Sequence, residues 1–461
     1  MSAEGLRAAE DKMRADGQDE EAVRSFARAY ERLEAGESAV IPSDSLEPAA
    51  DVPSLEDLPS SGALADALAR VAVVKLNGGL ATTMGLRGPK SLMEVRDGKS
   101  FLDVIVGQTV FLRERHGISL PLVLMDSFAT QADTLAALHA HPELGDQGGL
   151  APDFLQSMIP KLDAATLAPV LWPPDPSLEW CPPGHGDVYG ALRRSGMLDA
   201  LLARGFEYAM ISNADNLGST LDPRIAAHVV SSGVPFLMEV AQGTEADRKG
   251  GHVARRRSDG RLVLRESAQT PPEDAESFRD YRRWRYYNTN TLWVSLRALA
   301  SLLDASDGVL ELPLIINRKT VDPRDAESTP VVQLESAMGA AIGLFEGAAL
   351  LLVPRTRFAP VKTTDDLLVL RSDAYRVGEG MSIEPAGPTL PYVELDPRYY
   401  KLMDDFARRF PAGAPSLIDA TRLVVHGDVT FGAGVVVRGA VTVSADGGPM
   451  TVPDGTVLTG D

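Results

Sequence analysis

The feature that most constrains this chain is the run of residues 71–92, in which a short apolar segment precedes a glycine-rich loop and a lysine. The apolar residues 71–76 are largely β-branched, which is typical of a buried strand in a parallel sheet. Glycines let the backbone approach a ligand and direct N–H groups at anionic oxygens, and Lys90 adds a compact positive charge. The run indicates a nucleotide triphosphate site. The loop glycines are Gly78, Gly79, Gly85 and Gly88.

The loop matches neither of the two common phosphate-binding motifs. Pro89 separates Gly88 from Lys90, so the P-loop spacing is absent, and no G-x-G-x-x-G fingerprint occurs in the run. Taken alone, these glycines fit a structural turn after a strand equally well.

Composition narrows the class of protein. The 461 residues suffice for about three domains. A net charge of −19 argues against nucleic acid as a partner, because that requires a basic surface. The longest apolar stretch, near residues 344–353, is too short to span a bilayer, so we expect no membrane partner. The single cysteine, Cys181, excludes an intrachain disulfide and, with no signal-like N-terminus, fits a cytoplasmic location.

The negative charge also bears on any nucleotide site, because an acidic protein repels anionic ligands. A local basic cluster or a divalent cation must offset that field. Four basic residues around the glycine-rich loop are candidates for this role: Lys75, Arg87, Lys90 and Arg96.

The chain divides into three expected regions. Residues 1–61 predict a helical segment followed, from residue 41, by a linker rich in Pro, Ser, Asp and Glu. In residues 62–370, apolar runs at 71–76, 120–125, 207–212 and 235–241 alternate with helical stretches. This alternation predicts an α/β domain with a mainly parallel, Rossmann-like sheet flanked by helices, and ligands bind at the carboxyl ends of such strands.

Residues 371–461 end in a six-residue repeat. Large apolar residues recur every six positions in two registers, a period typical of a parallel β-helix. Two short antiparallel hairpins are the alternative. The end of such a module exposes unpaired strands at which a homo-oligomer can form. The repeated positions are Val425, Phe431, Val437 and Val443, and Val429, Val435 and Val441.

Two further segments contain chemically active side chains. In residues 180–189, Gly184 and Gly186 flank His185, whose imidazole can donate to a hydroxyl or phosphate oxygen, although a lone histidine is more often structural. In residues 211–218, Asp215 follows an apolar strand. A carboxylate there can bind Mg²⁺ when phosphates supply the other ligands, although Asp-Asn is also a common turn pair.

In their order, these motifs resemble those of the eukaryotic-type UTP–glucose-1-phosphate uridylyltransferases, also called UDP-glucose pyrophosphorylases. That family's loop reads K-L-N-G-G-L-G-T-x-M-G-x-x-G-P-K-S, and residues 75–91 match it except for Ala81 in place of Gly. Further matches are P-P-G-H-G-D at 182–187, N-x-D-N-L-G at 213–218 and R-x-R-F-x-P-V-K-T-T at 355–364. The resemblance covers residues 71 to about 370 and implies a catalytic nucleotidyltransferase domain over 62–370, followed by a left-handed β-helix.

The resemblance also implies roles for individual residues. Lys90, Lys362 and Asp215 are expected to be catalytic, with Asp215 as the Mg²⁺ ligand. The expected nucleotide contacts are Leu76, Asn77, Gly78, Gly79, Gln156, Gly184 and Asn213. The expected substrate contacts are His185, Lys249, Gly251, Asn288 and Asn290. A second departure lies beside Gln156, where the family's Q-S-R-Y-P-R-I appears with Met158 in place of the first Arg.

The implied reaction is attack of glucose 1-phosphate on the α-phosphorus of UTP, giving UDP-glucose and pyrophosphate. The nucleophile is already an anion, so catalysis consists of alignment and charge neutralisation. UDP-N-acetylhexosamine and UDP-galactose pyrophosphorylases remain alternatives. Glucose and galactose, for example, differ in the orientation of one hydroxyl, which a binding site distinguishes only by a small difference in affinity. A non-catalytic nucleotide-sugar sensor or scaffold is the alternative from another class.

Overall fold

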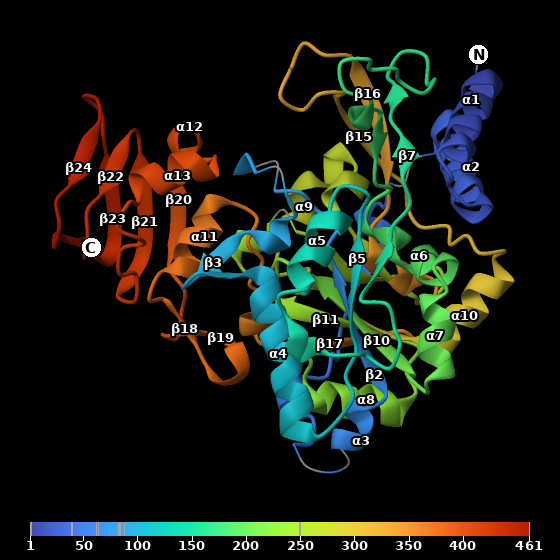
Figure 1. Cartoon of the computed structure of the whole chain (residues 1–461), viewed down its shortest axis with the longest axis horizontal. Helices are drawn as coiled ribbons and strands as arrows, with labels where there is room; N and C mark the ends of the chain where they lie inside the picture. Colours follow the sequence, from blue (N-terminus) through green and yellow to red (C-terminus); the bar gives the residue numbers. More distant parts are fainter. Residues whose placement is uncertain are drawn as a thin grey trace.

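The computed structural model of the protein describes residues 2–37, 40–60, 62, 64–81, 84–86, 88–248 and 250–460. A central α/β region lies between a pair of N-terminal helices and a C-terminal array of strands (Figure 1). Among the described residues, no helix combines the length and the apolar character that crossing a membrane requires.

In the described residues, the main sheet has ten strands, seven of them in the order β1-β12-β14-β10-β2-β5-β6. Four neighbours are parallel: β10 (Tyr208–Asn213), β2 (Val71–Leu76), β5 (Leu122–Asp126) and β6 (Asp153–Leu155). β11 (Phe236–Gln242) and β17 (Ala349–Val353) form another parallel pair. β2, β5, β10 and β11 lie within two residues of the strands predicted from the sequence. The predicted α/β class with a mainly parallel central sheet is therefore confirmed.

The sheet also contains antiparallel strands that the sequence pattern does not predict. β14 (Tyr286–Ser295) runs antiparallel between β10 and β11, and β12 (His252–Arg256) and β13 (Leu262–Arg265) continue the sheet beyond it. β1 (Leu46–Pro48) pairs with β12 at the edge and lies inside the segment 41–61, for which the composition predicts a linker. That segment is thus held to the sheet, with Leu46 buried.

Helices cover both faces of this sheet. Successive residues of β2 point into opposite cores: Val73 packs with α3, α4 and α8, whereas Val74 packs with α6, α7 and α10. The helices of the central region are α3 (Leu64–Leu68), α4 (Phe101–His116), α5 (Gln131–Leu138), α6 (Val188–Arg194), α7 (Met197–Ala203), α8 (Pro223–Ser232), α9 (Ala275–Phe278) and α10 (Leu296–Ala305).

The N-terminal helices dock on a layer of short strands. α1 (Ser2–Ala15) and α2 (Glu20–Glu34) lie beside β7 (Ile159–Pro160), which pairs with β9 (Trp180–Cys181) (Figure 1). β15 (Ile315–Thr320), β16 (Pro330–Glu335) and β8 (Leu162–Asp163) form a neighbouring sheet. Phe26 and Tyr30 of α2 share a buried cluster with residues of these strands, so the helix pair has its own core against them.

The C-terminal strands pair in parallel. The order is β20 (Tyr392–Leu395), β21 (Ala420–His426), β23 (Val436–Ser444) and β25 (Val457–Thr459), and β22 (Val429–Phe431) pairs in parallel with β24 (Met450–Val452). Val425 lies opposite Val443, an offset of 18 residues, or three six-residue repeats. All seven repeated apolar positions are buried. The parallel pairing excludes the alternative of two antiparallel hairpins.

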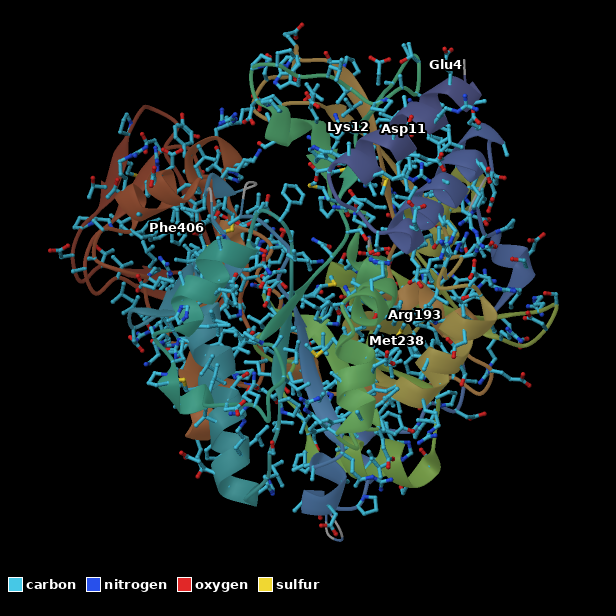
Figure 2. The ribbon with its side chains drawn as sticks, turned by 45° about the vertical axis from the view of Figure 1, so that its right-hand side comes forward. Glu4, Asp11, Lys12, Arg193, Met238 and Phe406 are labelled. Carbon is cyan, nitrogen blue, oxygen red and sulfur yellow. The ribbon has the colours of Figure 1, made fainter. Side chains whose placement is uncertain are left out.

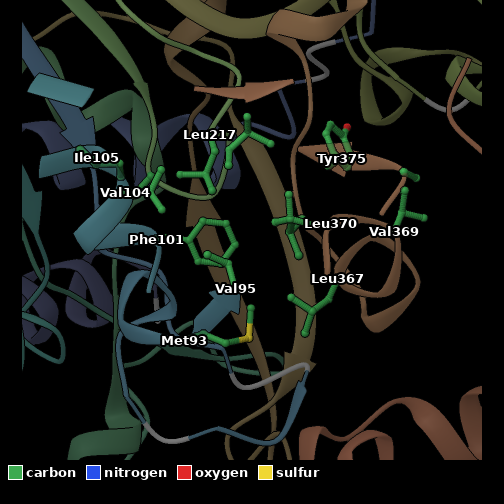
Figure 3. Close-up of a cluster of buried hydrophobic side chains, with 14 of the residues drawn as sticks. Met93, Val95, Phe101, Val104, Ile105, Leu217, Leu367, Val369, Leu370 and Tyr375 are labelled. Carbon is green, nitrogen blue, oxygen red and sulfur yellow. The ribbon is translucent and has the colours of Figure 1, made fainter. Parts of the chain in front are cut away.

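The C-terminal region shares a core with the central region. Tyr375 of the C-terminal region lies in one buried cluster with Leu367 and Leu370 of α11 (Thr364–Arg371), Phe101 of α4 and Val95 of β3 (Glu94–Arg96) (Figure 3). β3 pairs with β4 (Lys99–Ser100). The remaining elements are β18 (Tyr375–Val377) with β19 (Ile383–Pro385), α12 (Pro397–Tyr400) and α13 (Met403–Arg409).

Candidate active site

An open cavity of about 320 Å³ lies at the carboxyl ends of β2, β5 and β10. This is the edge at which parallel sheets bind ligands. Ten of the residues singled out from the sequence line it: Leu76, Asn77, Gly78, Gly79, Lys90, Gln156, Gly184, His185, Asn213 and Asp215. Motifs that lie far apart in the sequence thus meet in one cavity.

A buried polar group fixes the start of the glycine-rich loop. The Asn77 side-chain amide donates to Asp126 Oδ1 at 2.7 Å and to Thr134 Oγ1 at 2.9 Å, and Ser127 Oγ donates to the Gly78 carbonyl at 3.0 Å. Burial raises the pKa of the Asp126 carboxyl to about 6. Asp126 and Ser127 lie at the carboxyl end of β5, where the sequence motifs place no functional residues.

Gly78 is glycine because Gln156 lies against it. A Cβ at residue 78 would fall less than 3.0 Å from Gln156 Nε2. The Gln156 backbone N–H donates to the Asp126 carbonyl at 2.9 Å, so strand β5 places both residues. Ala81, the departure from the family's glycine, is buried and does not adopt a positive φ, so its methyl group is accommodated without backbone strain.

The N-terminal helices brace the segment that contains Gln156. Gln18 Oε1 accepts a hydrogen bond from the Met158 backbone N–H at 3.0 Å. Arg194 forms ion pairs with Asp19 at 3.2 Å and with Asp187 at 2.6 Å, and Asp187 accepts the Ser157 backbone N–H at 2.6 Å. On α1, Lys12, which is labelled in Figure 2, pairs with Glu179 of the same layer. Residues 2–34 are therefore a docked arm and not a loose tail.

His185 is held in one neutral form. Its Nδ1 accepts a hydrogen bond from the Met338 backbone N–H at 3.0 Å, which leaves the proton on Nε2. Desolvation lowers its pKa to about 4. Gly184 before it has φ +82°, and a Cβ there would lie 2.5 Å from the Ser336 carbonyl oxygen, so this turn requires glycine. His185 can thus donate a hydrogen bond without adding charge.

Lys90 and Asp215 form an ion pair across the cavity. Lys90 Nζ lies 2.7 Å from Asp215 Oδ2, and both side chains are 19% exposed. Asp215 Oδ1 is buried and accepts no hydrogen bond from the residues that the structure describes. These residues also include no cluster of three or more His, Cys, Asp or Glu side chains that could hold a metal ion. Oδ1 is thus the oxygen of this carboxylate that has no partner among the described residues.

The prediction of a basic cluster around the loop is wrong for two of the four residues. Arg96 donates to the Ser372 and Tyr375 carbonyls, so it contacts the C-terminal region and not the cavity. Lys75 is buried beneath the cavity, where its Nζ donates to Ser212 Oγ and to the Ser219 carbonyl, and burial lowers its pKa to about 7. Arg87 lies outside the described residues.

The other predicted substrate residues gather beside this cavity and do not line it. Gly251, just before β12, accepts the Asn288 N–H of β14, and the Asn288 amide donates to Asn290 Oδ1 at 2.7 Å. Asn290 has φ +55°, a positive angle that is uncommon for a non-glycine residue. Because Thr291 lies opposite Ser212 of β10, this group borders Asn213. Lys249 lies outside the described residues.

Glu266 is a candidate that the sequence motifs do not reveal. A Cβ on Gly251 would fall less than 3.0 Å from its carboxylate, which therefore fills the space beside that glycine. Burial raises the pKa of Glu266, and the nearby charge of Lys362 opposes that rise. Lys362 itself is exposed. The sequence R-E-S offers no motif from which Glu266 could be identified.

Comparisons with known proteins place this geometry in a family. The sequence model described as UTP--glucose-1-phosphate uridylyltransferase matches residues 23–438. The barley (Hordeum vulgare) UTP--glucose-1-phosphate uridylyltransferase is 41% identical over 427 residues, which are 92% of this chain and 86% of the barley protein. The Saccharomyces cerevisiae protein of the same name is 40% identical over 396 residues, 85% of this chain and 77% of its own.

Solved structures agree with the sequence comparisons. A UDP-glucose phosphorylase from Trypanosoma brucei superposes with a TM-score of 0.92 at 41% identity, covering 99% of this chain and 100% of the other. A UDP-glucose pyrophosphorylase from Leishmania major, solved in open and closed forms, superposes with a TM-score of 0.93 at 41% identity, covering 99% and 98%. The chain therefore belongs to the UTP–glucose-1-phosphate uridylyltransferase family.

Proposed function

We propose that this protein is a UTP–glucose-1-phosphate uridylyltransferase, which forms UDP-glucose and pyrophosphate. The observation that carries the proposal is the cavity itself, in which the family's nucleotide motifs meet around the Lys90–Asp215 pair. We assign catalysis to the domain of residues 62–370, which lies between an N-terminal segment (1–61) and a C-terminal domain (371–461), and we assign the protein a cytoplasmic location.

The chemistry needs no general base, because the attacking phosphate oxygen of glucose 1-phosphate is already an anion. A bond forms from that oxygen to the α-phosphorus, and the bond to the β-phosphate bridge oxygen breaks, so that pyrophosphate leaves with the electron pair. The barrier lies in aligning two anions, and the contribution of the protein is positioning and neutralisation. Lys90 is assigned to the departing pyrophosphate, and Lys362 and Lys249 to the incoming sugar phosphate.

We assign recognition of the uracil to the Gln156 amide and the Gly184 backbone, which face one cavity. Leu76, Asn77, Gly78, Gly79 and Asn213 line the same cavity, and we assign them to the remainder of the nucleotide. His185, kept neutral, is assigned to donate from Nε2 to an oxygen of the substrates. We assign binding of the hexose hydroxyls to Gly251, Asn288 and Asn290.

We propose Mg²⁺ as the cofactor, held by Asp215. The free Oδ1 fits this assignment, since Mg²⁺ bound to phosphates needs only one or two protein carboxylates. When bound, it would neutralise charge on the phosphate oxygens. In this structure Lys90 pairs with Oδ2, the other oxygen of the same carboxylate.

We further propose that the parallel C-terminal strands form a left-handed β-helix, through which copies of the chain associate as a homo-oligomer. The 18-residue offset between β21 and β23 supports this assignment, since it equals three six-residue faces per turn, and the β22–β24 and β23–β25 pairs are offset by 21 residues, three more than that turn. Light scattering of the purified protein tests the association.

Pyrophosphate release tests the proposed activity. The purified protein is supplied with UTP and Mg²⁺ and with glucose, galactose or N-acetylglucosamine 1-phosphate in turn. We expect release with UTP and glucose 1-phosphate, its loss on chelation with EDTA, and its loss in Asp215→Asn, which keeps the shape of the side chain. Faster release with N-acetylglucosamine 1-phosphate would reassign the substrate, and no release with any sugar would indicate a sensor or scaffold.

A further inference from the structure

The Asn216 side chain joins two segments of the candidate site. It follows Asp215 in the loop after β10 and is only 2% exposed. Its Oδ1 accepts the Ala359 N–H at 3.0 Å, and its Nδ2 donates to the Arg357 carbonyl at 3.1 Å. Both partners lie in the segment 355–361 that leads to Lys362, so one buried amide holds this segment at two points.

The backbones of the two segments are also paired. The Val361 N–H donates to the Asp215 carbonyl at 3.1 Å, and Asn216 forms an isolated antiparallel bridge with Pro360. Asp215 and Val361 are therefore directly hydrogen-bonded, and Lys362 is the next residue. The separation between the Asp215 carboxylate and the Lys362 side chain depends on this short pairing.

A buried ion pair anchors the far end of the second segment. Arg357 donates to both carboxylate oxygens of Glu239 at 2.6 and 2.7 Å, and Trp293 Nε1 donates to the same carboxylate at 2.9 Å. Glu239 and Trp293 are fully buried in β11 and β14. A buried ion pair often adds little net stability, but it has a fixed geometry. Arg357 is thus tied to the rigid sheet and gives Asn216 a firm partner.

The loop that contains Asp215 is fixed at its own ends by Lys75. Lys75 Nζ donates to Ser212 Oγ at 2.8 Å before the loop and to the Ser219 carbonyl at 2.7 Å after it. A Cβ on Gly218 would lie less than 3.0 Å from the Thr356 carbonyl, so the two segments are in backbone contact there. Between these fixed points, the Asn216 side chain spans from one segment to the other, and just after them Arg357 Nη2 donates to the Thr220 carbonyl at 2.8 Å.

We propose that Asn216 is a positioning residue that sets the placement of Lys362 relative to Asp215. This inference rests on the proposed function, in which Lys362 holds the sugar phosphate. Bringing two anions into line is the main task of such a site, and a misplacement of about 1 Å can cost about 100-fold in rate. The Asn216 amide donates to and accepts from the 355–361 segment, and its Oδ1 also accepts the Gly218 N–H of its own loop at 3.2 Å. Loss of the side chain should therefore shift Lys362 and Asp215 relative to each other.

A double-mutant cycle tests the inference. Asn216→Ala is measured alone and in a Lys362→Ala background, by quantifying UDP-glucose over hours so that slow variants are resolved. We expect Asn216→Ala to lower kcat/KM for glucose 1-phosphate about 10- to 100-fold while KM for UTP changes less than about threefold. In the Lys362→Ala background we expect less than about a threefold further loss, because the group being positioned is gone.

Gln147→Ala is the matched control. Gln147 is a buried amide that also makes hydrogen bonds with backbone and side-chain partners, accepting from Leu122 N–H and Arg113 and donating to the Leu122 carbonyl, but at the amino end of β5. We expect it to lower the melting temperature and leave both kinetic constants unchanged. An equal kinetic loss in Gln147→Ala, or a full additional loss of Asn216→Ala in the Lys362→Ala background, overturns the inference.

Two further points keep the test decisive. If Asn216→Ala does not fold, the cycle is run with Asn216→Asp, which keeps the accepting oxygen and loses the donor to Arg357; its loss must likewise vanish in the Lys362→Ala background. If the unmodified protein forms no UDP-glucose, the proposed function fails. Activity in the unmodified protein with additive losses in the cycle refutes only the role of Asn216.

Discussion

Substitution of Gly78 by alanine should weaken UTP binding through a single displaced side chain. The new methyl group would lie less than 3.0 Å from Gln156 Nε2, whereas an ordinary contact needs 3.4–4 Å. The clash falls on the end of a flexible side chain and not on backbone, and Gly78 has no positive φ to lose. The protein should therefore fold normally, with the Gln156 amide moved away from the uracil.

The size of the effect follows from the hydrogen bonds lost. An amide that reads uracil makes about two hydrogen bonds, each worth about 0.5–1.5 kcal/mol. Losing both costs about 1–3 kcal/mol, which is about a 5- to 150-fold fall in kcat/KM for UTP. Initial rates of pyrophosphate release at varied UTP and saturating glucose 1-phosphate measure this change. The preference for UTP over CTP should fall in parallel.

A second cycle isolates the cause. If Gly78→Ala acts only by moving Gln156, then Gln156→Ala should show the same loss, and the double variant should be no worse than either. Losses that add in the double variant, or an unchanged kcat/KM for UTP in Gly78→Ala with a normal melting curve, would refute the assignment of Gln156 to the base.

Three further predictions concern stability. Gly184→Ala should destabilise the fold by about 2 kcal/mol or more, because the new methyl group combines a positive φ with overlap on the Ser336 backbone. Thermal melting should show a larger loss of stability than in Gly233→Ala, where φ is also positive but no atom lies near the new methyl group. The pKa of His185 is lowered to about 4, so the unfolded chain binds more protons than the folded chain between about pH 4 and 6.5. His185 therefore contributes to stability above that window, and the contribution is lost as pH falls through it. His185→Gln should flatten that part of the plot of melting temperature against pH. The pKa of Asp126 is raised to about 6, so the folded state binds more protons than the unfolded state between about pH 4 and 6, and stability falls as pH rises through that window. Asp126→Asn should therefore gain about 2–3 kcal/mol of stability relative to the unmodified protein between pH 4 and 6. A stability difference between the two proteins that does not change with pH would contradict the burial of this charge.

The sequence predicts the central strands well because burial leaves a clear signal. Val71, Val73 and Val74 are apolar on both faces of β2, as a strand between two helical layers must be. Strand β14 gives no such signal, since its first half contains the polar Asn-Thr-Asn motif. Strand β1 has only three residues, which is too short for any periodicity to be recognised.

For the site, the sequence predicts which motifs take part, but it predicts the positions of their side chains only in part. Residues of separate loops meet in one cavity because parallel strands end at the same edge. Lys75 and Arg96 were misplaced because nearness in sequence is a poor guide to direction: Lys75 precedes the loop by a few residues yet points beneath the sheet edge, and Arg96 turns toward the residues that follow α11. Asp126, Asn216 and Glu266 act through contacts with distant segments, which a single sequence does not reveal.

The parallel pairing of the C-terminal strands, with Val425 opposite Val443 and Val436 opposite Val457, has a consequence for how such proteins can change in length. In the proposed β-helix, each circuit would touch only the circuits before and after it, so whole circuits could be gained or lost without disturbing their neighbours. Related chains should therefore differ here in steps of about 18 to 21 residues, and a grafted extra circuit should lengthen the molecule while leaving its chemistry untouched.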